Sequence, residues 1–284
     1  MASTLIAASA LPLKDEPRDA ALVILDCRFQ LNDKRAGRRA YDAGHVPGAH
    51  YADLEADLSG PIVPGVTGRH PLPELSELAQ KLRAWGVTSA ARVIAYDDAG
   101  GAMAARLWWL LRWLGHDAVF VCDGGYQAWL AAGGEPTRAS PPPAAGDFEP
   151  RPRSGWVVST AEVAQRAPST VLLDARAHER YRGEVEPIDA VPGHIPGALC
   201  VPVAGNLTAS GAFADPAALA ARYRAVVRGA APENVVVYCG SGVTACHDIL
   251  AAEHAGLGVF RLYAGSYSEW IADASRPVTT GDAP

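Results

Sequence analysis

The feature that most constrains this chain is an internal repeat, because the same succession of motifs occurs twice along its length. An apolar run closes with Asp-x-Arg at residues 26–28 and again at residues 174–176. A Gly-His-x-Pro-Gly-Ala motif follows at residues 44–49 and at residues 193–198. The counterparts keep their order and almost constant spacing, which excludes coincidence. The 284 residues, about two domains of ordinary size, are therefore expected to form two copies of one domain.

Two more motifs complete each copy. A second apolar run ends in Tyr followed by one special residue, which is Asp97 in the first copy and Cys239 in the second. The last motif, Gly-x-Tyr-x-x-Trp, occupies residues 124–129 and 265–270. Since Asp97 and Cys239 hold equivalent places, the two copies differ in chemistry at one strand end.

The alternation of short and long segments predicts the fold class. In each half, short β-branched runs alternate with longer Ala- and Leu-rich stretches, a pattern typical of α/β domains with a parallel sheet flanked by helices. The expected helices include residues 75–85, 103–114, 217–227 and 243–254. Residues 135–155 are rich in proline and small residues, which favours an extended linker between two domains. We expect a first, non-catalytic domain over 1–138, a linker over 139–155 and a second, catalytic domain over 156–284.

Composition excludes several classes of protein. A formal net charge of -6 argues against binding to nucleic acid, whose partners carry clustered Lys and Arg on a basic background. The apolar stretch within residues 1–13 is too short to span a membrane. The chain has 5 cysteines, an odd number at irregular spacings, and no CxxC pair for a metal or a dithiol site. We expect a cytoplasmic chain with reduced thiols, no bound metal and no membrane contact.

The residues that follow the second-copy strand suggest a nucleophile. Ligands of parallel sheets bind at the carboxyl ends of strands, where Cys239 opens a glycine-rich turn that runs into a helix. Backbone N–H groups of such a turn, together with the helix dipole, favour a thiolate. The expected anion cradle consists of Gly240, Ser241, Gly242, Val243, Thr244 and Ala245.

Other cysteine chemistries remain as alternatives at this point. A cysteine-dependent phosphatase needs an arginine six positions after the cysteine, where this chain has Ala245, so that class is disfavoured. A hydrolytic cysteine enzyme would need a histidine base, for which His45 and His247 are candidates. A third possibility is an inert cysteine buried in a strand–helix turn.

Together these motifs resemble the rhodanese superfamily, and specifically its tandem-domain sulfurtransferases, over essentially the whole chain. The resemblance implies a ping-pong cycle in which Cys239 takes a sulfane sulfur from a small anionic donor, becomes a persulfide and passes the sulfur to a thiol or cyanide. It implies no metal or organic cofactor. Asp97 is then the remnant of a lost cysteine. A catalytically silent, rhodanese-like interaction module is the alternative from another functional class.

The choice of donor depends on the loop. Family members that prefer thiosulfate carry Arg and Lys after the cysteine, whereas this chain has Gly240 and Ser241, similar to the branch that uses 3-mercaptopyruvate. That resemblance implies that Ser241 polarises the donor and that Arg180 holds its carboxylate. The branch has a second arginine where this chain has Ile188, for which Arg182 is a candidate replacement. Thiosulfate:cyanide sulfurtransfer by the same persulfide is the alternative.

A histidine completes the implied relay. The resemblance implies that a first-domain histidine acts with the serine, and His45 matches it as a substrate-binding residue, with Asp33 as a candidate acidic partner. His194 holds the equivalent place in the second copy, which indicates a structural role for at least one of the two. The repeated Asp-x-Arg motifs favour a fold-maintaining charge network, because one of them lies in the half without a nucleophile.

Overall fold

The computed structural model describes residues 4–15, 21–141 and 145–284. Parts of the expected linker and of the amino-terminal apolar stretch, at residues 142–144 and 1–3, lie outside the described residues. Within the described part of the chain, no helix has the length and apolar character needed to cross a membrane.

The chain divides into two compact units. Unit 1 comprises residues 1–60, 73–153 and 209–213. Unit 2 comprises residues 61–72, 154–208 and 214–284. Two short segments are thus grouped with the opposite half of the sequence, and the one at 61–72 brings residues of the first half into unit 2.

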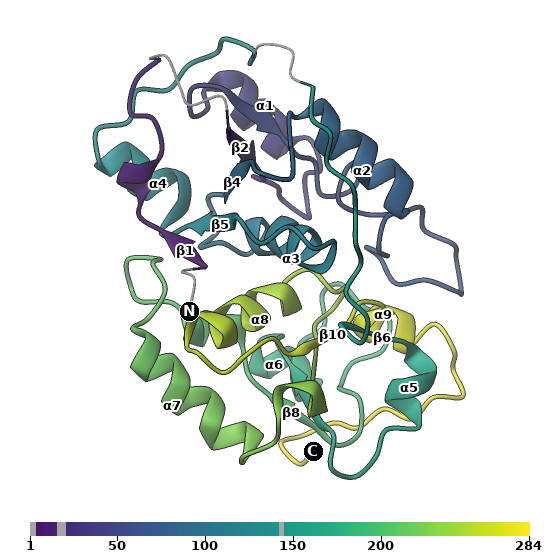
Figure 1. Cartoon of the computed structure of the whole chain (residues 1–284). Coiled ribbons are helices and arrows are strands. Elements are labelled where there is room, and N and C mark those ends of the chain that lie inside the picture. The colour runs from purple at the N-terminus through teal and green to yellow at the C-terminus, as the bar shows by residue number, and fades with distance from the viewer. Residues whose placement is uncertain (1–3, 16–20, 142–144) are drawn as a thin grey trace. The chain divides into compact units, whose positions relative to one another are not determined.

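Unit 1 is built on a five-stranded, fully parallel sheet with the strand order β1-β5-β4-β2-β3. Its strands are β1 (Leu5–Ile6), β2 (Leu22–Asp26), β3 (Ala49–Tyr51), β4 (Arg92–Tyr96) and β5 (Val119–Cys122) (Figure 1). Its helices are the 3₁₀ helix η1 (Ala8–Ala10) and α1 (Ala36–Ala43), α2 (Leu75–Ala84), α3 (Ala104–Trp113) and α4 (Gly125–Ala131).

Unit 2 repeats this arrangement with the strand order β6-β10-β9-β7-β8, again all parallel. Its strands are β6 (Val157–Val158), β7 (Val171–Asp174), β8 (Ala198–Cys200), β9 (Val235–Tyr238) and β10 (Arg261–Tyr263). Its helices are α5 (Thr160–Ala164), α6 (His178–Tyr181), α7 (Pro216–Val227), α8 (Ala245–His254) and α9 (Ser266–Trp270), with the 3₁₀ helices η2 (Val203–Asn206) and η3 (Pro232–Asn234). In Figure 1, α7 and α8 lie next to each other.

The two sheets correspond strand by strand, which confirms the α/β class and the tandem repeat. The central strand β9 shows why its sequence is continuously apolar. Val236 and Tyr238 join a core cluster with Val163 and Trp270, while α8 contacts the same strand. Because side chains alternate along a strand, both faces of β9 are covered.

The repeated Asp-x-Arg motif connects the sheet to the motif that follows it. In unit 2, Arg176 donates to both carboxylate oxygens of Asp174 and, at 2.7 Å, to the carbonyl of Gly193. Arg28 and Asp26 make the same bidentate pair in unit 1. Both pairs are buried, and removing one partner of such a pair costs about 3–5 kcal/mol. These contacts bear out the structural interpretation of the motif.

Candidate active site

The Cys239 thiol lies at the carboxyl end of β9, where the sequence predicts the nucleophile. Its Sγ accepts N–H groups from Gly242 at 3.1 Å and from Ser241 at 3.5 Å. Val243 and Thr244 then lead into α8, which begins at Ala245. Backbone N–H groups aimed at a sulfur stabilise its thiolate form. Among the described residues, the hydrogen bonds that reach Sγ therefore come from Ser241 and Gly242 of the expected cradle.

Gly242 is the residue that gives this turn its shape. Its φ is 79°, in the left-handed region that L side chains rarely adopt. A Cβ at this position would stand 2.3 Å from the carbonyl oxygen of Ala264. No side chain fits here without moving the loop, so the N–H group that Gly242 presents to the sulfur depends on glycine.

The start of α9 holds the backbone of the nucleophile. The Ser266 hydroxyl accepts the N–H of Cys239 at 3.1 Å and donates to the Tyr263 carbonyl at 2.9 Å. The N–H of Tyr267 donates to the Cys239 carbonyl at 2.9 Å, and that of Ser268 to the Gly240 carbonyl at 3.0 Å. The second Gly-x-Tyr-x-x-Trp motif is thus the support of the cysteine loop, a role that its sequence alone does not reveal.

Unit 1 shows what the same turn contains when the cysteine is missing. The Asp97 carboxylate accepts four backbone N–H groups, from Ala99, Gly101, Met103 and Ala104, at 2.8 to 2.9 Å. These N–H groups form an anion nest that the protein fills with its own carboxylate. The geometry supports the interpretation of Asp97 as a remnant site without transferable sulfur.

A histidine that the sequence reasoning missed lies beside the cysteine loop. His70 belongs to the segment 61–72 of unit 2, and its Nδ1 is 2.8 Å from the Ser241 Oγ. His70 and Ser241 are 3% and 8% exposed, so their hydrogen bond is shielded from water. The only signal for His70 is that its Arg-His-Pro-Leu-Pro stretch is present in one copy of the repeat and has no counterpart in the other.

His45, which the sequence suggested for substrate binding, is engaged inside unit 1. Its Nδ1 lies 2.8 Å from the Tyr41 carbonyl and its Nε2 lies 3.1 Å from the Ala139 carbonyl. His194 makes the same pair of contacts in unit 2, and each ring stacks on a tyrosine. Asp33 pairs with Arg39 at the surface. The geometry thus favours a structural role for His45, because both of its ring nitrogens are already used.

Arg180, the expected donor contact, lies between two buried acids. Its Nη2 is 2.8 Å from Glu186 and 2.8 Å from Asp189. Burial acts to raise the pKa of Glu186, but hydrogen bonds from Arg180 and from the backbone of Asp189 and Ile188 outweigh it and hold that pKa below its ordinary value. The Glu186 carboxylate therefore stays charged at neutral pH. Arg182, the candidate replacement for the arginine missing at position 188, instead pairs with Glu184 and Asp282.

His247, a candidate base for a hydrolytic enzyme, lies in another polar group of unit 2. Its Nδ1 is 3.1 Å from the Asn206 Nδ2, and that amide also donates to Asp248 at 2.6 Å. Tyr223 donates to the same carboxylate at 3.0 Å. The His247 ring is therefore held by Asn206, and this arrangement does not support a cysteine–histidine hydrolase.

The remaining cysteines are poor nucleophiles. Burial raises the pKa of Cys122 and of Cys200 to about 12, and it raises that of Cys27 well above its ordinary range. Cys246 is fully buried, and its thiol donates to the Gly242 carbonyl at 3.4 Å. Thiolate chemistry in this chain is therefore expected at Cys239 alone.

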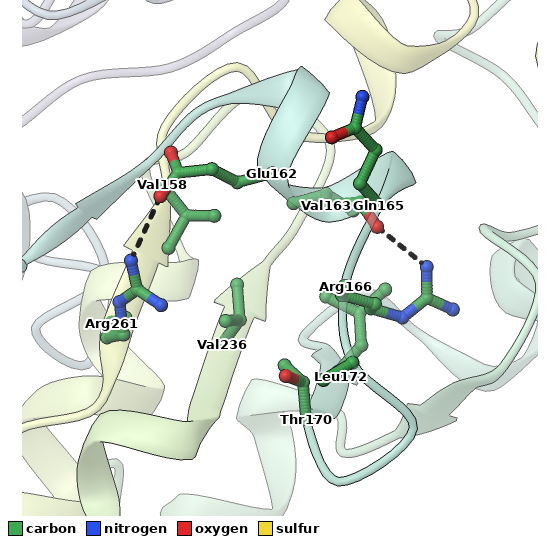
Figure 2. Close-up of a pocket in the computed structure, with 10 residues that line it drawn as sticks. Val158, Glu162, Val163, Gln165, Arg166, Thr170, Leu172, Val236 and Arg261 are labelled. Atoms are coloured by element: carbon green, nitrogen blue, oxygen red, sulfur yellow. Dashed lines mark hydrogen bonds and ion pairs between the residues drawn. The ribbon is translucent and has the colours of Figure 1, made fainter.

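A separate pocket of about 290 Å³ lies at the amino ends of the strands of the unit 2 sheet (Figure 2). Thr170 and Arg261, at the amino ends of β7 and β10, line it. Figure 2 shows its Glu162–Arg261 ion pair at 3.3 Å and the hydrogen bond from Arg166 to the Val163 carbonyl at 2.9 Å. Since Cys239 follows the carboxyl end of β9, this pocket is not part of the cysteine site.

Comparison with known proteins identifies the family. The model of the rhodanese-like domain matches the chain twice, over residues 9–132 and 159–273. The chain belongs to the rhodanese family. Each match covers four of the five strands of one sheet, and the second match contains the Cys239 loop.

Relatives of this rhodanese-family chain cover nearly its whole length. It is 52% identical over 264 residues to the "Probable 3-mercaptopyruvate sulfurtransferase" of Pseudomonas aeruginosa, which covers 92% of this chain and 93% of that protein. It is 40% identical over 265 residues to the "Putative thiosulfate sulfurtransferase SseB" of Mycobacterium tuberculosis, covering 92% and 91%. The crystal structure of the 3-mercaptopyruvate sulfurtransferase SseA from Escherichia coli matches with a TM-score of 0.79 at 29% identity, covering 94% of this chain and 100% of that one.

These relatives and the intact cysteine loop make this chain a sulfurtransferase of the rhodanese family. A catalytically silent interaction module, the alternative from the sequence, is not supported, because the loop in unit 2 keeps both its thiol and the N–H groups that hold it.

Proposed function

We propose that the protein transfers sulfur from 3-mercaptopyruvate, through a persulfide on Cys239, to a thiol or to cyanide. The observation that carries this proposal is the joint placement of two groups on one turn. The Cys239 Sγ accepts N–H groups from Gly242 and Ser241, and the hydroxyl of that same Ser241 is hydrogen-bonded to His70. The nucleophile therefore lies next to a Ser241–His70 pair that can donate a hydrogen bond to the donor.

The first half-reaction breaks the carbon–sulfur bond of the donor. The Cys239 thiolate attacks the donor sulfur, the new S–S bond forms, and the C–S bonding electrons pass to the carbon chain as the enolate of pyruvate. Transfer of the sulfhydryl proton to that carbon then gives pyruvate and the Cys239 persulfide anion. The N–H groups that hold the thiolate in the turn can also stabilise the persulfide charge.

Ser241 and His70 act on the oxygen of the enolate. Negative charge grows on the ketone oxygen as the C–S bond breaks, so a hydrogen bond donated there is worth more in the transition state than in the substrate. In the tautomer with a proton on Nδ1, His70 donates to the Ser241 Oγ and leaves the serine hydroxyl free to donate to the ketone. Ser241 is then a catalytic residue and His70 positions its hydroxyl.

The second half-reaction returns the cysteine. An acceptor thiol gives its proton to the Cys239 persulfide anion, and the resulting thiolate attacks the outer sulfur. The S–S bond breaks, the acceptor leaves as a persulfide and Cys239 regains its thiolate. Cyanide reacts with the persulfide anion in the same way and leaves as thiocyanate. Gly240, Val243, Thr244 and Ala245 complete the proposed cradle around this exchange.

The free thiols of the chain fit a reducing compartment, and we propose the cytoplasm.

Thiosulfate is the second candidate donor, favoured by the similarity to SseB of M. tuberculosis. Its transfer releases sulfite and involves no enolate, so it needs no hydroxyl at a ketone oxygen. We therefore expect Ser241→Ala to lower kcat/KM for mercaptopyruvate about 10- to 100-fold, as loss of one hydrogen bond to a developing charge does, while changing thiosulfate turnover by less than about threefold. Steady-state kinetics with both donors tests this. Equal losses for the two donors, or higher efficiency of the wild type with thiosulfate, would contradict mercaptopyruvate as the preferred donor.

A further inference from the structure

The position of His70 depends on the irregular segment that carries it. Residues 61–72 belong to unit 2, although they come from the first half of the sequence. Among the described elements, no helix or strand includes these residues. The hydrogen bond between the His70 Nδ1 and the Ser241 Oγ, at 2.8 Å, needs both side chains held in place. Contacts of the segment with other parts of unit 2 must therefore align the histidine.

Ser268, in α9, is tied to both sides of that hydrogen bond. Its Oγ accepts the backbone N–H of Arg69, the residue directly before His70, at 3.1 Å. Its own backbone N–H donates to the carbonyl of Gly240, the residue directly before Ser241, at 3.0 Å. One residue thus connects the backbone before the histidine to the backbone before the serine.

Close packing at Gly68 reinforces this connection. A Cβ on Gly68 would stand 2.4 Å from the carbonyl oxygen of Gly265 and 2.9 Å from the Ser268 Oγ. The backbone of the segment therefore lies directly against the start of α9 and leaves no room for a side chain. The Arg69 side chain adds an ion pair with Asp189. The hydroxyl of Ser268 is thus one of several contacts that hold the segment, and its loss should displace the segment without releasing it.

We propose that Ser268 is a positioning residue for the sulfur-transfer reaction, because it holds His70 in the place from which the histidine orients the Ser241 hydroxyl. The inference rests on the mercaptopyruvate function proposed above, in which Ser241 donates to the ketone oxygen of the donor. A hydrogen bond to a developing charge depends steeply on geometry, so a small displacement of His70 weakens it. Alanine at position 268 keeps the N–H that donates to Gly240, so the turn that holds the Cys239 sulfur retains this support.

The kinetic test compares a ketone donor with a donor that has no ketone. We expect Ser268→Ala to lower kcat/KM for mercaptopyruvate about 3- to 10-fold, mainly through kcat, as loss of one neutral hydrogen bond does. Thiosulfate turnover should change by less than about twofold. Ser268→Thr keeps a hydroxyl and should stay within about twofold of the wild type on both donors. Ser275→Ala removes an exposed hydroxyl that donates to Asp273, and this matched control should leave both donors unchanged.

A double-mutant cycle tests whether Ser268 acts through the histidine. If it does, the His70→Ala/Ser268→Ala double variant should be within about twofold of His70→Ala on mercaptopyruvate. Gly68→Ala, whose methyl group meets the Gly265 carbonyl, should show the same donor-selective loss as Ser268→Ala. Additive losses in the double variant, or equal losses of Ser268→Ala on the two donors, would overturn the inference.

A measurement without any donor separates this inference from the proposed function. The ¹⁵N chemical shift of the His70 Nδ1 reports its hydrogen bond, and the His70 signal, one of 8 histidine signals, is the one missing from His70→Gln. We expect this signal to move in Ser268→Ala and to stay in place in Ser275→Ala. A signal that does not move in Ser268→Ala would overturn the positioning role. Failure of the proposed function is recognised differently, because the wild type would then form no persulfide from mercaptopyruvate.

Discussion

Comparing Gly242→Ala with Gly229→Ala separates two properties of the Gly242 backbone. The first is its φ of 79°, which costs an L side chain roughly 1–2 kcal/mol. The second is the room that it leaves for the Ala264 carbonyl, which a Cβ would approach to 2.3 Å. Gly229 provides a matched control, since its φ is 82° and a Cβ added there meets nothing within 4 Å. Gly229→Ala therefore carries the backbone cost without the collision.

The collision at Gly242 must move the loop, and the N–H that lies 3.1 Å from the Cys239 Sγ moves with it. A hydrogen bond to a charged acceptor is worth about 1.5–3 kcal/mol, which corresponds to roughly a 10- to 100-fold lower rate constant of persulfide formation. Rapid-quench mass spectrometry at a fixed mercaptopyruvate concentration measures that rate constant, and urea unfolding measures the stability of both variants. We expect both variants to lose stability and only Gly242→Ala to lose rate. A Gly242→Ala rate near that of the wild type, or an equally slow Gly229→Ala, would refute the role assigned to the N–H cradle.

Two further predictions concern buried acids outside the reaction. In Asp97→Asn an NH2 group replaces one carboxylate oxygen, so two of the four backbone N–H groups lose their acceptor. The free energy of unfolding should therefore fall by about 2–4 kcal/mol, while the rate of persulfide formation in the folded protein stays unchanged. Urea titration measures the first quantity and stopped-flow kinetics the second. Burial raises the pKa of Asp248 to about 7, against hydrogen bonds from Asn206 and Tyr223. Since this folded-state pKa lies above the unfolded one, Asp248 contributes stability at acid pH that is lost as the pH rises from about 4 to about 7, by at most about 1.4 kcal/mol per pH unit. The difference in unfolding free energy between wild type and Asp248→Asn should show that slope, and a difference independent of pH would argue against it.

The sequence was sufficient for the architecture because the relevant signals are local and duplicated. The repeated motifs predicted two equivalent sheets, and the expected helices correspond to α2, α3, α7 and α8. A strand end followed by a glycine-rich turn has the same meaning wherever it occurs in a parallel sheet, so the place of Cys239 could also be read from the sequence.

The partners of the cysteine loop could not be read in this way. His70 contacts Ser241 across 171 positions, and Arg69 reaches Asp189 across 120, from a segment without a regular period or a counterpart in the second copy. A repeated motif instead drew attention to His45, although its equivalence to His194 indicated a structural role for at least one of the two. Long-range contacts made by an irregular segment depend on where the folded chain brings it, and local patterns do not encode that position.

The central claim is that Cys239 carries the sulfur, and one measurement tests it most directly. The protein is incubated with one equivalent of mercaptopyruvate without acceptor, blocked with an alkylating reagent, digested and analysed by mass spectrometry, with Cys239→Ser as the control. We predict one added sulfur on the peptide that contains Cys239, none on the peptides of the other four cysteines, and no release of pyruvate by the variant. Sulfur found on another cysteine, or pyruvate formation that persists in Cys239→Ser, would contradict the mechanism.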